Sequence, residues 1–144
     1  MTKGERAYKL FKDGYNCSQA VALAFKEEMN LPEETVKRLI IGFGGGFARQ
    51  RLVCGAVSGM VMVISYLKSD GKDKLAIYKI IQDACAEVKK SIGSIICAEL
   101  LDESDSVKTS PTPDARTREY YEKRPCADIC KLVADVTDKY IKQI

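Results

Sequence analysis

The longest apolar stretch of the chain covers residues 52–67 and reads LVCGAVSGMVMVISYL. Glycine, serine and cysteine interrupt it, and it is shorter than the roughly 20 apolar residues that a helix needs to cross a bilayer. We therefore interpret it as a buried core helix that follows a glycine-rich segment and ends near Lys68. We predict no membrane insertion.

Hydrophobic residues recur at helical spacing on both sides of this core helix, and no run of alternating residues predicts a strand. The polar run Asp102–Asp114 is predicted to be an exposed loop. The sequence therefore predicts an all-α fold, a compact bundle of about five to seven helices that forms one domain over residues 1–144. Outside the core helix, the predicted helices cover Glu5–Lys12, about Cys17–Met29, Pro32–Gly42, Leu75–Gly93, Ile95–Leu101 and Pro125 to the C-terminus.

The charged residues do not predict a nucleic-acid partner, because 23 basic and 20 acidic residues are interleaved and give a formal net charge of only +3. The chain contains no His, which excludes imidazole metal ligands and His-based acid–base catalysis by its own side chains. No apolar signal segment follows Met1, so we expect a cytoplasmic location.

Six cysteines are the side chains of this chain that are best able to react or to bind a metal. Stable disulfides between them are not expected in a cytoplasmic protein. Two of them, Cys17 and Cys126, are predicted in the first turn of a helix, where the helix dipole stabilises a thiolate. Cys126 and Cys130 are four residues apart on one helix face, so they could ligate a metal, act as attacking and resolving thiols, or pack in the core. We assign Cys85 to the core.

Glycines form a second pattern. The run Gly44, Gly45, Gly46 is not a dinucleotide fingerprint, because no strand precedes it and Phe47 stands where a third spaced glycine is needed. The alternatives are a simple turn, or an anion site with Arg49 and Arg51 nearby. Small residues at positions 55 and 59 allow either a tight helix crossing or ligand access. The candidate cofactor-binding residues are Gly44, Gly45, Gly46, Gly55 and Gly59.

Three motifs, residues 14–21 (GYNCSQAV), 42–46 (GFGGG) and 54–59 (CGAVSG), are followed by cysteines on the C-terminal side. In this order the motifs resemble the redox-active family named for its C_GCAxxG_C_C pattern. The resemblance implies four characteristic cysteines and a genomic setting near transporters or oxidoreductases. By position, these cysteines match Cys17, Cys54, Cys97 and either Cys126 or Cys130.

Three hypotheses follow. In the first, the cysteines lie close together and perform thiol–disulfide or electron-transfer chemistry with an unidentified redox partner or a transporter-associated protein; the catalytic candidates are Cys17, Cys54, Cys97, Cys126 and Cys130. In the second, a zinc ion or an iron–sulfur cluster is bound by four thiolates, which are Cys17, Cys54, Cys97 and Cys130. In the third, the chain is a non-catalytic interaction protein with buried cysteines. A homodimer is compatible with each of them.

Overall fold

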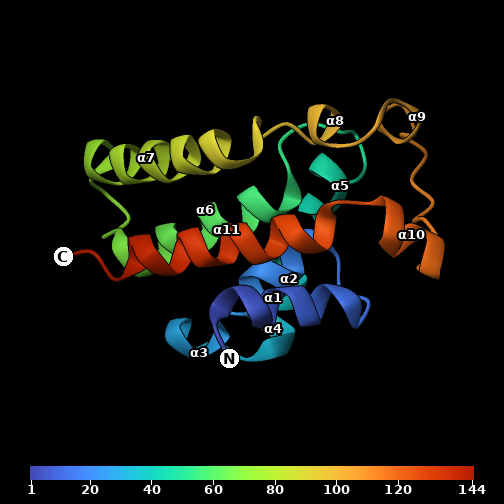
Figure 1. Cartoon of the computed structure of the whole chain (residues 1–144). Coiled ribbons are helices and arrows are strands. Elements are labelled where there is room, and N and C mark those ends of the chain that lie inside the picture. The colour runs from blue at the N-terminus through green and yellow to red at the C-terminus, as the bar shows by residue number, and fades with distance from the viewer.

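The computed structural model describes all 144 residues and confirms the all-α prediction. In Figure 1, α6 and α11 run through the middle of the molecule, α7 lies above them, and α1 to α4 lie below. The helices are α1 (Lys3–Lys12), α2 (Cys17–Leu23), α3 (Lys26–Met29), α4 (Glu33–Ile40), α5 (Gly44–Phe47), α6 (Gly55–Lys68), α7 (Lys74–Ile92), α8 (Cys97–Leu100), α9 (Glu103–Ser106), α10 (Arg118–Lys123) and α11 (Cys126–Ile141), with a 3-10 turn, η1, at Ile41–Phe43.

The number of helical segments exceeds the predicted five to seven. Four of the eleven α segments, α3, α5, α8 and α9, have only four residues each. The helix predicted over Cys17–Met29 is divided at Phe25, whose φ of −112° and ψ of 14° are not helical. The helix α10 was not predicted and interrupts the region before Pro125. Without the four-residue segments, seven helices remain.

The core is one cluster of buried hydrophobic side chains at the crossing of α1, α2, α6 and α11. Val57 and Met60 of α6 are buried there together with Val21 of α2 and Val133 of α11. Gly59 belongs to this crossing, since a Cβ atom added to it would lie 2.8 Å from the Ser18 carbonyl oxygen. Gly59 therefore allows the backbones of α2 and α6 to approach closely.

Two predicted helix starts are confirmed by their caps. The side chain of Asn16 accepts a hydrogen bond from the Gln19 N–H at 3.0 Å, and the Gln19 side chain accepts one in return from the Asn16 N–H. This capping box places Cys17 as the first residue of α2. Pro125 precedes the first residue of α11, Cys126, as predicted.

The core helix begins later than predicted. Residues 47–51 include four positive φ angles, and Val53 pairs with Ile96 in an isolated antiparallel bridge, so helical structure starts only at Gly55. The predicted interior residue Cys54 is therefore the N-cap of α6. Because α6 begins three residues later than predicted, its first residue, Gly55, lines the site described below.

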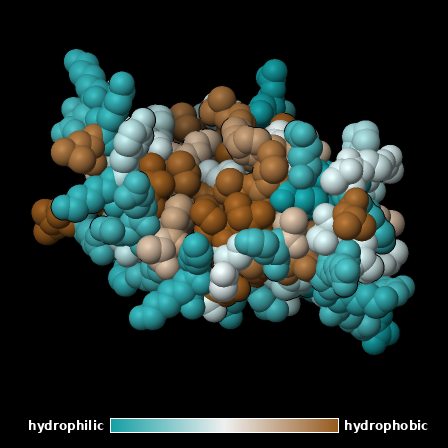
Figure 2. Space-filling model, turned by 90° about the horizontal axis from the view of Figure 1, so that it is seen from above, coloured by the Kyte–Doolittle hydropathy of each residue, from teal (hydrophilic) through white to brown (hydrophobic).

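None of the helices combines the length and the apolar composition that spanning a bilayer requires. The helix α7 is the least buried of the long helices, with only Ala84 and Val88 buried. The face that lies uppermost in Figure 1 carries a band of hydrophobic residues in its middle, surrounded by hydrophilic residues (Figure 2).

Candidate functional site: a cysteine and arginine cavity

Most of the cysteines and glycines that the sequence indicates as site candidates line one cavity of about 340 Å³. We call it the cysteine cavity. Four thiols, four guanidinium groups and one carboxylate line it, together with apolar side chains that include Phe11, Leu100 and Ile129. The polar lining residues with ionisable side chains are Cys17, Cys54, Cys97, Cys126, Arg49, Arg51, Arg116, Arg124, Asp114 and Tyr120.

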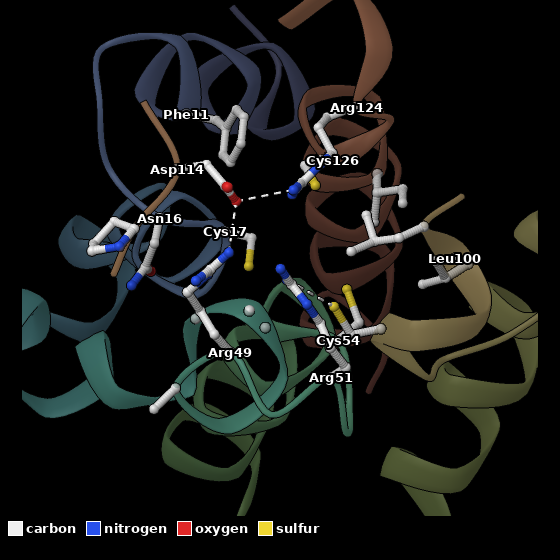
Figure 3. Close-up of a pocket in the computed structure, with 18 of the residues that line it drawn as sticks. Phe11, Asn16, Cys17, Arg49, Arg51, Cys54, Leu100, Asp114, Arg124 and Cys126 are labelled. Carbon is white, nitrogen blue, oxygen red and sulfur yellow. Dashed lines mark hydrogen bonds and ion pairs between the residues drawn. The ribbon is translucent and has the colours of Figure 1, made fainter. Parts of the chain in front are cut away.

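Each of the four cavity cysteines stands at the start of a helix. Cys17, Cys97 and Cys126 are the first residues of α2, α8 and α11, and Cys54 is the N-cap of α6. Unpaired N–H groups and the positive end of the dipole lie at such positions, and they favour a negative charge. In Figure 3 the sulfurs of Cys17, Cys54 and Cys126 point into the space between these helices.

The glycines account for the position of Cys17. A Cβ atom added to Gly55 would lie 2.4 Å from the Cys17 Sγ, so only glycine leaves room for this sulfur against the first turn of α6. The Gly45 N–H faces the same sulfur. Gly44, Gly45 and Gly55 line the cavity, whereas Gly46 does not. At Gly46 an added Cβ would lie 2.5 Å from the Leu52 backbone nitrogen, so this glycine closes the turn.

An unusual backbone segment follows the first glycine. All five residues from Gly45 to Arg49 have positive φ, and so does Arg51, with φ 63°. Such angles cost about 1–2 kcal/mol for a residue other than glycine, and they persist where surrounding contacts enforce them. Here the Arg51 N–H donates to the Gly45 carbonyl at 3.1 Å, and the Leu52 N–H donates to the Gly46 carbonyl at 3.1 Å. The segment thereby brings Arg49 and Arg51 to the cavity.

Cys54 and Cys97 are placed by a short pairing of two extended segments. The Cys54 N–H donates to the Ile95 carbonyl at 2.8 Å, and the Cys97 N–H donates to the Leu52 carbonyl at 2.6 Å. Because side chains alternate along an extended segment, Cys54 and Cys97 lie on the same side of this pair as diagonal neighbours. Residues 43 positions apart in the chain thus share one wall of the cavity.

Arg51 is the buried cation of the site. Only 5% of its surface is exposed. Its Nε donates to the Lys108 carbonyl at 3.0 Å, and its Nη1 lies 3.8 Å from the Cys97 Sγ. Its Nη2 has no hydrogen-bond partner. A buried donor left unpaired lowers the free energy of unfolding by about 1–3 kcal/mol. This arrangement is therefore more typical of a functional site than of ordinary core packing.

Asp114 links two of the other arginines. Its carboxylate lies 3.0 Å from Arg49 Nη2 and 2.9 Å from Arg124 Nη2, as the dashed lines in Figure 3 show. Arg124 Nε also contacts Asp105 at 3.0 Å. Arg49 donates in addition to the carbonyls of Ser110 and Thr112.

These contacts correct the prediction for Asp102–Asp114, which we call the strap. Its composition predicts an exposed loop, and most of its residues are exposed. It contains the one-turn helix α9, however, and Pro111, Pro113 and Asp114 line the cavity. Ion pairs with cavity arginines therefore hold the strap against the site.

The fourth arginine has no carboxylate partner. Arg116 donates to the carbonyls of Phe11 and Tyr15, both at 2.8 Å, and lies 4.1 Å from the centre of the Phe11 ring. The Phe11 ring thereby covers one face of the guanidinium. Sequence reasoning missed Arg116, Arg124 and Asp114. The three arginines and two tyrosines within residues 116–124 are a signal that could have indicated Arg116 and Arg124, whereas no sequence signal marks Asp114.

Burial dominates the titration of three cavity thiols. It raises the pKa of Cys17 and of Cys54 above the ordinary value of 9.0, and it raises the pKa of Cys126 to about 12. For Cys54, the N–H groups of Val57 and Ala56 oppose the shift, as the start of a helix should. Burial also raises the pKa of Cys130. These thiols stay protonated near neutral pH.

The structure separates the two candidates for the fourth cysteine. Cys126 lines the cavity, whereas Cys130 is fully buried in the core, with its Sγ 3.8 Å from the Cys17 carbonyl oxygen. Cys85 lies on α7 and does not line the cavity. No group of three or more Cys, Asp or Glu side chains is arranged closely enough to hold a metal ion.

The chain is all-α, and four cysteines at helix starts line one arginine-rich cavity. These features define a class of helical protein whose thiol site is assembled from several separate helices. The family model described as "Putative redox-active protein (C_GCAxxG_C_C)" matches residues 15–140, and the chain belongs to this family. No curated protein and no solved structure matches the chain.

Proposed function

We propose that the cysteine cavity performs thiol–disulfide exchange, with Cys97 as the attacking thiol. The observation that carries this proposal is the position of Arg51 Nη1, 3.8 Å from the Cys97 Sγ, in a cavity that three other thiols also line. Reactive cysteines in proteins typically have a cationic side chain beside the sulfur, and such cysteines act as nucleophiles in exchange reactions.

The other three thiols are better suited to a second step. Burial raises the pKa of Cys17, Cys54 and Cys126, so these groups hold their protons near neutral pH. Cys126 also has a guanidinium near it, that of Arg124, but burial outweighs its effect. Cys97 has Arg51 Nη1 3.8 Å from its Sγ and is the first residue of α8. This difference assigns the attacking role to Cys97 and leaves the resolving role to one of its three neighbours.

The reaction proceeds in two exchanges. The Cys97 thiolate attacks one sulfur of a disulfide in the partner, forms a mixed disulfide and releases one thiolate, which takes up a proton. A second cavity cysteine then loses its proton and attacks the Cys97 sulfur, which releases the second partner thiol. The partner disulfide is reduced to two thiols while two protein thiols become a disulfide, and the reverse sequence oxidises a partner dithiol.

Oxidised and reduced glutathione mixtures test this proposal on the pure, reduced protein. We expect the number of accessible thiols to fall by two, and peptide mass spectrometry to find Cys97 in the new disulfide. The variant Cys97→Ser should lose this response. Cys85→Ser is the matched control and should keep it, because Cys85 lies outside the cavity. Unreactive thiols, or a disulfide that lacks Cys97, would refute the assignment.

The competing hypothesis is a zinc or iron–sulfur site on Cys17, Cys54, Cys97 and Cys130. The donor set fits this poorly, because Cys130 lies in the core behind the Cys17 backbone and no three cysteines form a compact group. Anaerobic purification followed by metal analysis and an absorption spectrum separates the two hypotheses. Metal in stoichiometric amount would replace the thiol-exchange proposal.

The partner stays a prediction. An unidentified redox protein or a transporter-associated protein with a disulfide would supply the second half of the reaction. A homodimer and a cytoplasmic location also stay predictions. The third hypothesis, an interaction protein with buried cysteines, agrees best with Cys130, which is fully buried in the core and does not line the cavity. Cys54 and Cys97 are also buried, but both line the cavity.

A further inference from the structure

The Nη2 group of Arg51 is the one buried side-chain nitrogen or oxygen without a hydrogen-bond partner. Its side chain is 95% buried, since only 5% of the residue surface is exposed. In Figure 3 the guanidinium points into the middle of the cavity, between Cys17 and Cys126. An arginine is always charged and offers five donors. The protein therefore keeps a charged donor free inside a cavity.

The charge balance of the cavity points the same way. Arg49 and Arg124 are paired with Asp114 and Asp105. Arg51 and Arg116 line the same cavity, and no carboxylate lies within ion-pair distance of either. Two positive charges are thus uncompensated in a cavity that is partly closed off from solvent, where electrostatic attraction is stronger than in water.

The supply of free donors limits the charge of the ligand. The donors of Arg116 are directed at backbone carbonyls and the Tyr121 hydroxyl, and those of Arg49 at the strap. Arg124 donates to Asp105 and Asp114, and Arg51 Nη2 is the one fully buried side-chain donor without a partner. A doubly charged phosphate needs several donors, whereas one carboxylate group can accept hydrogen bonds from the N–H groups of a single guanidinium nitrogen.

The rest of the cavity is suited to an apolar body. Half of its 22 lining residues are hydrophobic, and its volume of about 340 Å³ lies within the range of small-molecule sites. We propose that the cysteine cavity is a binding site for a small organic monocarboxylate, whose carboxylate pairs with Arg51 Nη2 and whose apolar part lies against Phe11, Leu100 and Ile129. This inference holds whether or not the cysteines exchange disulfides.

Benzoate and its uncharged counterpart benzamide test the proposal with the reduced, full-length protein. We expect benzoate to bind by isothermal titration calorimetry and benzamide to bind at least tenfold more weakly, because hydrogen bonds to charged groups contribute about 10- to 100-fold in affinity. The variant Arg51→Gln should lose this preference. Arg38→Gln is the matched control, because Arg38 is exposed on α4 outside the cavity.

A measurement on the unaltered protein covers the case in which Arg51→Gln fails to fold. In two-dimensional ¹H–¹⁵N spectra, benzoate should shift the amide signals of Gly45 and Cys97 and leave those of Leu75 on α7 unchanged. Equal binding of benzoate and benzamide would overturn the proposal, as would benzoate binding that Arg51→Gln does not change. No binding at millimolar benzoate, or inorganic phosphate binding more tightly than benzoate, would overturn it as well.

Discussion

Gly55 and Cys17 are in direct contact across the interface of α6 and α2, so closely that a Cβ at Gly55 would lie 2.4 Å from the Cys17 Sγ. A second contact of the same hypothetical atom, 2.8 Å to the Phe43 carbonyl, closes the site from the other side. The first glycine of the CGAVSG segment is thus needed to accommodate a sulfur of the cavity. Gly55 therefore shapes the site, in addition to being the first residue of α6.

Gly55→Ala should therefore destabilise the protein by about 1–3 kcal/mol, the usual range for overpacking a well-packed interior. Urea unfolding measures this change. Cys17→Ala in the same chain should recover part of the loss, because it removes one of the two clashing atoms. Gly42→Ala is the control, since nothing lies within 4 Å of a Cβ at Gly42. An unchanged stability of Gly55→Ala would contradict the close contact.

Arg51→Gln should slow the alkylation of Cys97 by iodoacetamide at pH 7 by about tenfold, because it removes the guanidinium whose Nη1 lies 3.8 Å from the Cys97 Sγ. Mass spectrometry of the peptide that contains Cys97 follows the reaction. Arg38→Gln should leave the rate unchanged. An equal rate in both variants would show that the guanidinium does not activate this thiol.

The pH dependence of stability tests the burial of Cys126. Burial raises the pKa of this thiol to about 12 from the ordinary value of 9.0. Below pH 9 both the folded and the unfolded chain keep the proton. Between about 9 and 12 only the folded chain keeps it, so the free energy of unfolding falls as pH rises, by about 1.4 kcal/mol per unit for one such group. Urea unfolding of Cys126→Ala between pH 8 and 11 should show a shallower fall than the unaltered protein. Parallel curves would contradict the predicted shift.

Asp114→Asn should loosen the strap, because the Asp114 carboxylate joins Arg49 and Arg124. We expect faster amide hydrogen exchange over residues 105–114 and a loss of about 1–2 kcal/mol in the free energy of unfolding, since the pair is only partly exposed. Asp138→Asn, which removes the exposed pair with Lys142, is the control and should change stability by less than about 0.5 kcal/mol. Unchanged exchange in the strap would mean that apolar contacts hold it.

Local signals were read correctly where the responsible contacts are themselves local. The capping box at Asn16 uses residues three apart, and it places Cys17 at the first position of α2. Pro125 sets the start of α11 in the same way and places Cys126. The predictions for these two cysteines as helix-start residues therefore hold in the structure.

The start of α6 shows where local signals mislead. Phe47, Ala48 and Arg49 all have positive φ, which an isolated chain of these residues disfavours. The hydrogen bonds that close the turn are local, but distant residues hold the conformation as well. Val53 pairs with Ile96, and the side chains of Arg49 and Arg51 donate to carbonyls within residues 108–112. The apolar run therefore predicts a helix that begins too early, and Cys54 is wrongly placed in its interior.

The sequence by itself determined the helical class and the family, and it predicted Cys17, Cys54 and Cys97 as three of the four family cysteines, because periodicity, caps and motifs are properties of neighbouring residues. Only the tertiary structure decided between Cys126 and Cys130 as the fourth cavity cysteine, and only it placed Arg51 against Cys97. These contacts join residues 46 or more positions apart, and their geometry depends on how whole helices cross. Packing of the core, rather than local propensity, therefore builds the site.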